Sequence, residues 1–210
     1  MEVPGDRGVP EAATSGREEG KSLGEWKGRV GWAPANGSFQ AFVTAMRVTH
    51  GDDRTREWLK GMIDNDAREY PKNSAIVRAV GAGEVELGLV NHYYLMRFLA
   101  EDEAFPAANF FPPAGDPGAL VNVAGAAVLR SATRDAETTE NAHALIASLL
   151  SETAQQDFAI RTFEYPLIEG VSPVKGLRPL DEIQSPDIDL SDLADLRGTL
   201  EMLRETGALP

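Results

Sequence analysis

The segment Leu87–Tyr94 most constrains how this chain can fold. It begins with the short apolar run Leu87–Val90, which contains one glycine and is typical of a parallel strand covered on both faces. Leu95–Leu99 continues with helical spacing. The segment therefore predicts a central strand that leads directly into a helix. The phenols of Tyr93 and Tyr94 lie at this junction, where open α/β folds place their ligands.

Strands and helices alternate along the rest of the chain. The predicted strands are about Arg29–Ala33, Leu87–Val90, Asn109–Pro112 and Leu120–Leu129. The predicted helices are about Ser38–His50, Asp53–Ile63, Asn73–Val80, Tyr94–Glu101, Ala136–Leu150, Thr153–Thr162 and Ser191–Glu205. This alternation predicts an α/β fold with a mainly parallel sheet flanked by helices.

Composition excludes several classes of protein. Hydrophobic residues make up 42% and charged residues 25% of the 210 residues, as in globular proteins. The formal net charge of -13 argues against a nucleic-acid-binding protein, which needs a basic face. Cysteine is absent, which excludes disulfides, thiolate nucleophiles and cysteine-bound metals. No stretch reaches the length of a membrane-spanning helix, so we expect no membrane insertion.

The first residues, from Met1 to about Lys21, are polar and contain no apolar run. A signal peptide needs an apolar stretch of roughly 7–15 residues, so the sequence predicts no signal peptide here. We expect residues 1–21 to form a disordered tail.

Two adjacent phenols suit a hard, highly charged cation. A phenol ordinarily keeps its proton at neutral pH, and a bound ion of high charge overcomes this preference. Ferric iron is acidic and oxygen-seeking enough to do so. Simple packing is the ordinary explanation of a bare Tyr-Tyr pair, so the pair alone does not establish a metal site, and the surrounding residues have to support one.

Small polar residues stand at two predicted helix starts, Asn36-Gly37-Ser38 and Asn73-Ser74. A helix N-terminus offers backbone N–H groups and the positive end of the helix dipole, which together bind anions. Gly37 lacks a Cβ, which lets a ligand approach its backbone closely. Ordinary helix capping is the alternative interpretation of the same residues.

Seven short segments, taken together and in order, resemble one known family. They are Trp26–Gly31, Pro34–Phe39, Glu57–Gly61, Lys72–Ser74, Asn91–Tyr94, Asp116–Val121 and Glu164–Leu167. Their order and spacing are similar to those of the periplasmic ferric-ion-binding proteins, the solute-binding subunits of iron ABC transporters. These belong to the transferrin-like class of two-lobed periplasmic binding proteins.

The resemblance implies a ferric ion held by the phenolates of Tyr93 and Tyr94, with a synergistic anion such as phosphate or carbonate. The residues implied to hold that anion are Asn36, Gly37, Ser38, Asn73 and Asn91. For His92 it implies a structural or exposed role, and for Tyr165 a structural role, rather than metal binding. The implied partner is the permease of an ABC transporter, and the implied location is the periplasm or the cell surface. We expect a monomer.

The resemblance also implies a division into lobes. Residues 22–121 and 178–210 would form one lobe, and residues 122–177 a fragment of the opposite lobe. In the family, a His and a Glu from that opposite lobe complete the iron site. Nothing before Trp26 matches their context, so the chain is expected to be truncated at its N-terminus.

Three alternatives stand beside this interpretation. The chain could be a truncated, non-binding remnant or interaction module, or a receptor for another oxyanion. It could also be an enzyme, but it has no GxSxG elbow, cysteine nucleophile or P-loop, so we expect it not to be one.

Overall fold

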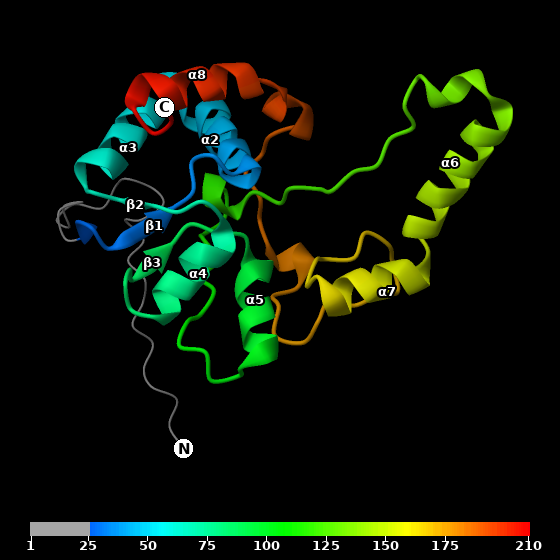
Figure 1. Ribbon diagram of the computed structural model, residues 1–210, viewed down its shortest axis with the longest axis horizontal. Helices are drawn as coiled ribbons and strands as arrows, with labels where there is room; N and C mark the ends of the chain where they lie inside the picture. Colours follow the sequence, from blue (N-terminus) through cyan, green and yellow to red (C-terminus); the bar gives the residue numbers. More distant parts are fainter. Residues whose placement is uncertain (1–25) are drawn as a thin grey trace. The chain divides into compact units, whose positions relative to one another are not determined.

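A computed structural model describes residues 26–210, so the tail predicted for residues 1–21 lies outside the described residues. The described chain divides into two compact units (Figure 1). The first unit contains residues 26–120 and 184–210, and the second contains residues 121–183. None of the helices in residues 26–210 is long and apolar enough to cross a membrane.

A small parallel sheet forms the centre of the first unit. Its strands are β1 (Val30–Trp32), β2 (Arg68–Glu69) and β3 (Leu87–Gly88), in the order β2-β1-β3. In register, Gly31 faces Arg68 on one side and Gly88 on the other. The sheet is therefore parallel throughout, as the alternation of strands and helices predicted.

The prediction that the Leu87–Val90 strand is central was wrong. β1 pairs with both neighbours, whereas β3 pairs only with β1 in this sheet, and Leu87 and Gly88 are half-buried rather than covered on both faces. The central strand is β1, all of whose residues are buried. β2 was not predicted from the sequence, because Arg68 and Glu69 are both exposed and carry no apolar pattern.

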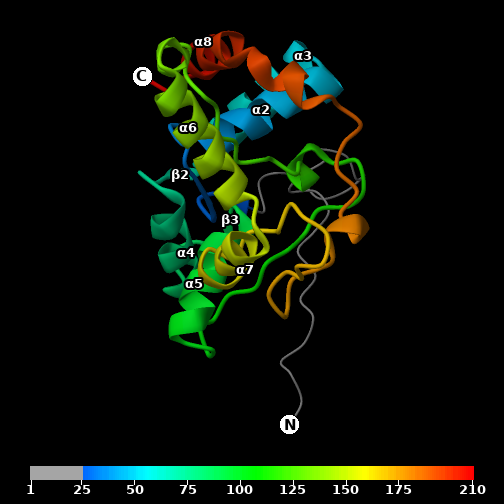
Figure 2. The ribbon, with the colours of Figure 1, turned by 90° about the vertical axis from the view of Figure 1, so that its right-hand side faces the viewer.

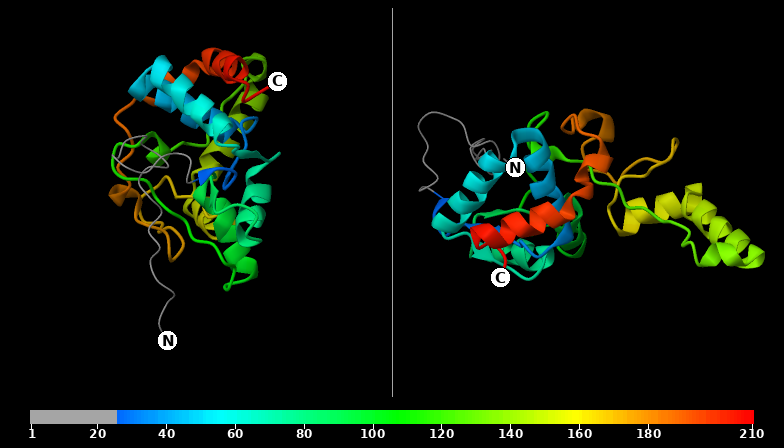
Figure 3. Two further views of the ribbon diagram at one scale, coloured as in Figure 1. Left: turned by 90° about the vertical axis from the view of Figure 1, so that its left-hand side faces the viewer. Right: turned by 90° about the horizontal axis from the view of Figure 1, so that it is seen from above.

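Helices cover both faces of this sheet (Figure 2). One layer consists of α2 (Gly37–His50), α3 (Asp52–Asp64) and α8 (Leu196–Thr206), and the other of α4 (Asn73–Gly81) and α5 (His92–Glu101). Gly51 joins α2 to α3 with a φ of 83°, a conformation that favours glycine. Seen from above, α8 lies beside α2 and α3 (Figure 3).

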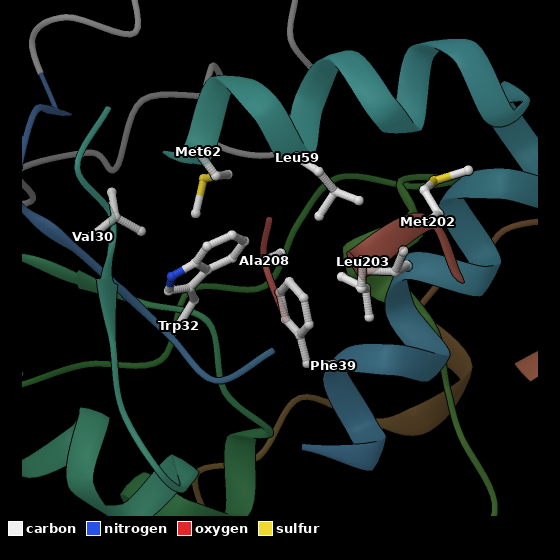
Figure 4. Close-up of a cluster of buried hydrophobic side chains, with 9 residues drawn as sticks. Val30, Trp32, Phe39, Leu59, Met62, Met202, Leu203 and Ala208 are labelled. Carbon is white, nitrogen blue, oxygen red and sulfur yellow. The ribbon is translucent and has the colours of Figure 1, made fainter. Parts of the chain in front are cut away.

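The main core lies between the sheet and the layer of α2, α3 and α8 (Figure 4). Its buried side chains are Val30, Trp32, Phe39, Val43, Leu59, Met62, Met202, Leu203 and Ala208. The Trp32 ring meets the Phe39 ring edge to face, with 5.6 Å between centroids. The segment after residue 184 thus returns to complete the core that begins with β1.

The helix predicted for Ser191–Glu205 is interrupted. A 3-10 turn, η5 (Leu190–Ala194), precedes α8, and Asp195 separates the two with a non-helical ψ of 57°. The Asp195 carboxylate accepts a hydrogen bond from the backbone N–H of Gly198 at 3.0 Å, so it caps the new helix rather than continuing the old one.

The second unit consists of α6 (Ala136–Leu149), α7 (Glu152–Arg161) and irregular segments, with short 3-10 turns at η3 (Ala132–Arg134) and η4 (Leu180–Glu182). Both helices were predicted from the sequence. Buried Gln155 ties the unit together, because its side chain donates to the Leu149 carbonyl at 2.8 Å and accepts from the Leu167 N–H at 2.7 Å.

Two predicted strands, Asn109–Pro112 and Leu120–Leu129, are wrong. Neither range forms a strand, and η2 (Pro117–Ala119), capped by Asp116, lies between them. A strand requires a neighbouring strand to satisfy its backbone groups, and neither range pairs with another strand in the described part of the chain. Apolar sequence alone did not reveal this lack of a partner.

Candidate metal and anion site

Three helix starts lie at one edge of the sheet. The strands are parallel, so their carboxyl ends share an edge, and each strand is followed by a helix: β1 by α2, β2 by α4 and β3 by α5. The N-termini of these helices therefore direct backbone N–H groups and positive partial charge towards the same side of the sheet. This edge contains every site residue predicted from the sequence.

At the start of α2, Asn36 caps the helix. Its side-chain oxygen accepts a hydrogen bond from the Ser38 backbone N–H at 2.9 Å. Gly37 is exposed, and a Cβ added there would meet nothing within 4 Å. The Ser38 N–H is thus used within the cap, while the backbone of Gly37 borders open space that a small anion could enter.

The starts of α4 and α5 are joined by two asparagines. Asn73 is 2% exposed, and its side-chain amide donates to the Asn91 side-chain oxygen over 3.1 Å. The two residues are 18 positions apart in sequence. Parallel pairing of β2 and β3 on either side of β1 explains how the fold brings them together.

Two phenols lie in the first turn of α5, separated from Asn91 by His92. The rings of Tyr93 and Tyr94 have centroids 4.6 Å apart with planes inclined by 35°, and both residues are half-buried. The ring of His92 meets Tyr93 at 5.5 Å and 81°, close to edge to face. The adjacent phenols therefore form one paired group at the helix start.

Sequence reasoning missed Arg97, which belongs to the same group. Its guanidinium carbon lies 5.5 Å from the ring centroid of Tyr93 and 5.5 Å from that of Tyr94. The signal was available in the sequence, because residues three and four positions apart share one face of a helix.

The segment predicted to be a strand at Asn109–Pro112 instead supports the start of α5. The Asn109 amide donates to the His92 carbonyl at 3.0 Å, and the Phe111 ring lies 6.5 Å from the His92 ring. No local pattern in the sequence predicts such a contact, because it depends on the path of the chain between residues 101 and 109.

Other candidate ligands lie elsewhere. Within residues 26–210, no three His, Cys, Asp or Glu side chains gather closely enough to hold a metal ion. The Tyr165 hydroxyl donates to the Arg178 carbonyl at 2.7 Å, and partial burial raises the pKa of this phenol. This bond agrees with the structural role expected for Tyr165.

The chemistry of the edge combines two kinds of group. Helix starts and amides favour an anion, and adjacent phenols favour a hard cation once they lose their protons. A cation and an anion bound together at this edge would balance each other's charge.

Comparison with known proteins gives consistent results. The family described as bacterial extracellular solute-binding protein matches residues 23–189. The chain is 31% identical over 186 residues to the major ferric iron-binding protein of Neisseria meningitidis serogroup B, a match that covers 87% of this chain and 54% of that protein. It is 32% identical over 192 residues to the Fe(3+)-binding periplasmic protein of Serratia marcescens, covering 88% of this chain and 54% of that protein.

A solved structure shows the same fold. Iron-bound HitA from Pseudomonas aeruginosa superposes with a TM-score of 0.81 at 30% sequence identity, and the match covers 95% of this chain and 62% of that chain. This similarity confirms the predicted α/β lobe of a periplasmic binding protein. The chain spans about half the length of the curated relatives it matches.

The family match covers most of the chain and confirms the resemblance inferred from the seven segments. It also agrees with the expectation of a binding protein rather than an enzyme, since the matched family is one of solute-binding proteins. The chain belongs to the family of bacterial extracellular solute-binding proteins.

Proposed function

We propose that this chain binds ferric iron through the phenolates of Tyr93 and Tyr94, together with a synergistic anion such as phosphate or carbonate. The anion contacts Asn36, Gly37, Ser38, Asn73 and Asn91 at the starts of α2, α4 and α5. The observation that carries the proposal is the pairing of the two phenol rings, 4.6 Å apart, next to the hydrogen-bonded asparagines Asn73 and Asn91.

Charge balance favours this combination. Ferric iron is a hard cation that prefers oxygen ligands, and its charge promotes loss of the phenol protons. Two phenolates cancel two of its three charges, and an anion held by the helix starts cancels the rest. Water fills the remaining coordination positions on the side that the phenols leave open.

The named relatives support iron as the cargo. The proteins from Neisseria meningitidis and Serratia marcescens are named for ferric iron binding, and the latter for the periplasm. We extend both properties to this chain, which then delivers iron from the periplasm or the cell surface to the permease of an ABC transporter. The chain spans about half the length of these relatives, so the delivery role of the whole protein is part of the proposal.

A titration with ferric nitrilotriacetate in phosphate buffer tests the proposal. A phenolate-to-iron charge-transfer band in the visible spectrum is expected, and Tyr93→Phe or Tyr94→Phe should abolish it. Citrate should compete with the phenols for the iron, because it also offers hard oxygen ligands. The Tyr165→Phe variant is the matched control, since that hydroxyl is engaged with the Arg178 carbonyl, and it should retain the band.

His92→Ala should also retain the band, because the variant keeps both phenols and keeps the His92 backbone carbonyl that accepts from Asn109, and removes a ring that packs against Tyr93. A double Tyr93→Phe/Tyr94→Phe variant that binds ferric iron as well as the parent would show that the phenols only pack. Phosphate binding without any ferric band would instead indicate a receptor for another oxyanion.

A further inference from the structure

Arg97 contacts both phenols at once. Its guanidinium carbon lies 5.5 Å from each of the two ring centroids, within the roughly 6 Å over which a cation attracts an aromatic face. The centroids of Tyr93 and Tyr94 are 4.6 Å apart, so the three groups form one cluster.

The helix itself produces this cluster. Arg97 follows Tyr93 by four positions and Tyr94 by three, and helical side chains lean towards the N-terminus. The long arginine side chain therefore reaches back over the first turn of α5. On another side, the ring of His92 meets Tyr93 at 5.5 Å. Tyr93 is thus bordered by a ring edge, a second phenol and a cation.

We propose that Arg97 is a positioning residue, which holds Tyr93 and Tyr94 in one paired orientation before ferric iron arrives. A planar guanidinium stacks on aromatic faces in a way that an ammonium group does not. Two phenols ordered in advance lose less side-chain freedom when a metal binds, which improves affinity. The effect of Arg97 on iron affinity rests on the proposed function. The ordering of the two rings in the metal-free chain does not.

An opposing effect is repulsion between the arginine and the metal. Two phenolates leave only one net positive charge on the ferric ion, and Arg97 is exposed, so water and salt screen the repulsion. Ordering should outweigh it. Two exposed cation–aromatic contacts correspond to an affinity change of about tenfold.

The test compares Arg97→Met and Arg97→Lys with the control Arg78→Met, using ferric nitrilotriacetate in phosphate buffer. Arg78, in α4, is also exposed, and its guanidinium carbon lies 5.7 Å from the ring of Phe98 in α5, so its loss removes a similar stack on a ring that is not a phenol. Arg97→Met should weaken iron binding about tenfold. It should also move the band to longer wavelength, since a cation over the rings makes phenolate electrons harder to transfer. The iron affinity and band position of Arg97→Lys should lie between those of the parent and those of Arg97→Met. Arg78→Met should match the parent in both.

Unchanged affinity and band position in Arg97→Met would overturn the proposal, as would equal losses in Arg97→Met and Arg78→Met. If the parent shows no band, the proposed function fails, and proton NMR of the metal-free chain then decides the positioning role. Ring currents should shift the Arg97 δ-methylene protons upfield, and a Tyr93→Leu/Tyr94→Leu variant should lose that shift. Unshifted protons in the parent would contradict the proposal.

Discussion

Replacing Thr199 with valine tests a buried chain of hydrogen bonds between α2 and α8. Thr44 and Thr199 are 2% and 0% exposed, and their hydroxyl oxygens lie 2.7 Å apart. Thr44 donates to the Gln40 carbonyl at 2.9 Å. Since that uses the Thr44 proton, Thr199 donates to Thr44 and accepts from Arg47 Nη1 at 3.0 Å. The donor and acceptor are thereby assigned in each of these three hydrogen bonds.

Valine keeps the shape of threonine but leaves the Thr44 oxygen without its donor. A buried polar group that loses its partner costs about 1–3 kcal/mol. Arg47 retains its ion pairs with Asp52 at 2.8 Å and Asp195 at 3.0 Å, so we expect a loss of about 1–2 kcal/mol for Thr199→Val. The double variant Thr44→Val/Thr199→Val removes both partners, and its cost should fall below the sum of the single costs by about 1 kcal/mol.

Urea unfolding monitored by tryptophan fluorescence measures these costs. The three tryptophans, Trp26, Trp32 and Trp58, all belong to the first unit, so the signal reports on the unit that contains the hydrogen-bond chain. Thr49→Val is the control, because the half-buried Thr49 hydroxyl donates to the Ala45 carbonyl of its own helix, and its cost should stay within about 0.5 kcal/mol. A double variant whose cost equals the sum of the two single costs would refute the reasoning.

Two further predictions concern the same unit. Gly88→Ala would place a Cβ 2.4 Å from Cγ2 of Ile76, so we expect a loss of about 1–3 kcal/mol and a lower urea midpoint; an unchanged midpoint would contradict the packing of β3 on α4. The Gly198 N–H, and after it the Arg47 guanidinium, lower the pKa of the Asp195 carboxyl. A lowered pKa stabilises the fold above the ordinary aspartate value of about 3.9, and this is lost as the pH falls through the folded pKa. The stability of Asp195→Asn should therefore fall less than that of the parent on acidification below about pH 5, and equal falls would contradict this role.

The sequence predicted the helices best, because their backbone hydrogen bonds form within one segment of the chain. The helices α2, α3, α4, α6 and α7 were predicted from the sequence, and the structure has them within a few residues of the expected ranges. Helix hydrogen bonds form within one segment, so a segment's own sequence contains most of the information.

Sheet pairing was predicted less well because it joins distant segments. The order β2-β1-β3 depends on which strands meet, and neither the exposed Arg68–Glu69 strand nor the unpaired Leu120–Leu129 segment reveals this in its own residues. Asp195, where the last helix is interrupted, also pairs with Arg47 in α2 at 3.0 Å, a contact between distant segments that the local sequence does not reveal.

The same distinction between local and distant contacts applies to the residues of the candidate site. Tyr93 and Tyr94 are adjacent in sequence, so their pairing could be anticipated, whereas the bond between Asn73 and Asn91 depends on the pairing of the sheet and was not predicted. Arg97 could have been found from helical spacing. Asn109, which supports the start of α5, could not.

Resonance Raman spectroscopy of the ferric complex tests the central claim most directly. Excitation within the visible band enhances vibrations of the groups bound to iron, so the parent should show tyrosinate ring modes, and Tyr93→Phe and Tyr94→Phe should each lose them. The Tyr165→Phe control should keep the parent spectrum. A ferric complex of the parent without tyrosinate modes, or with modes that persist in the double Tyr93→Phe/Tyr94→Phe variant, would contradict iron binding by these two phenols.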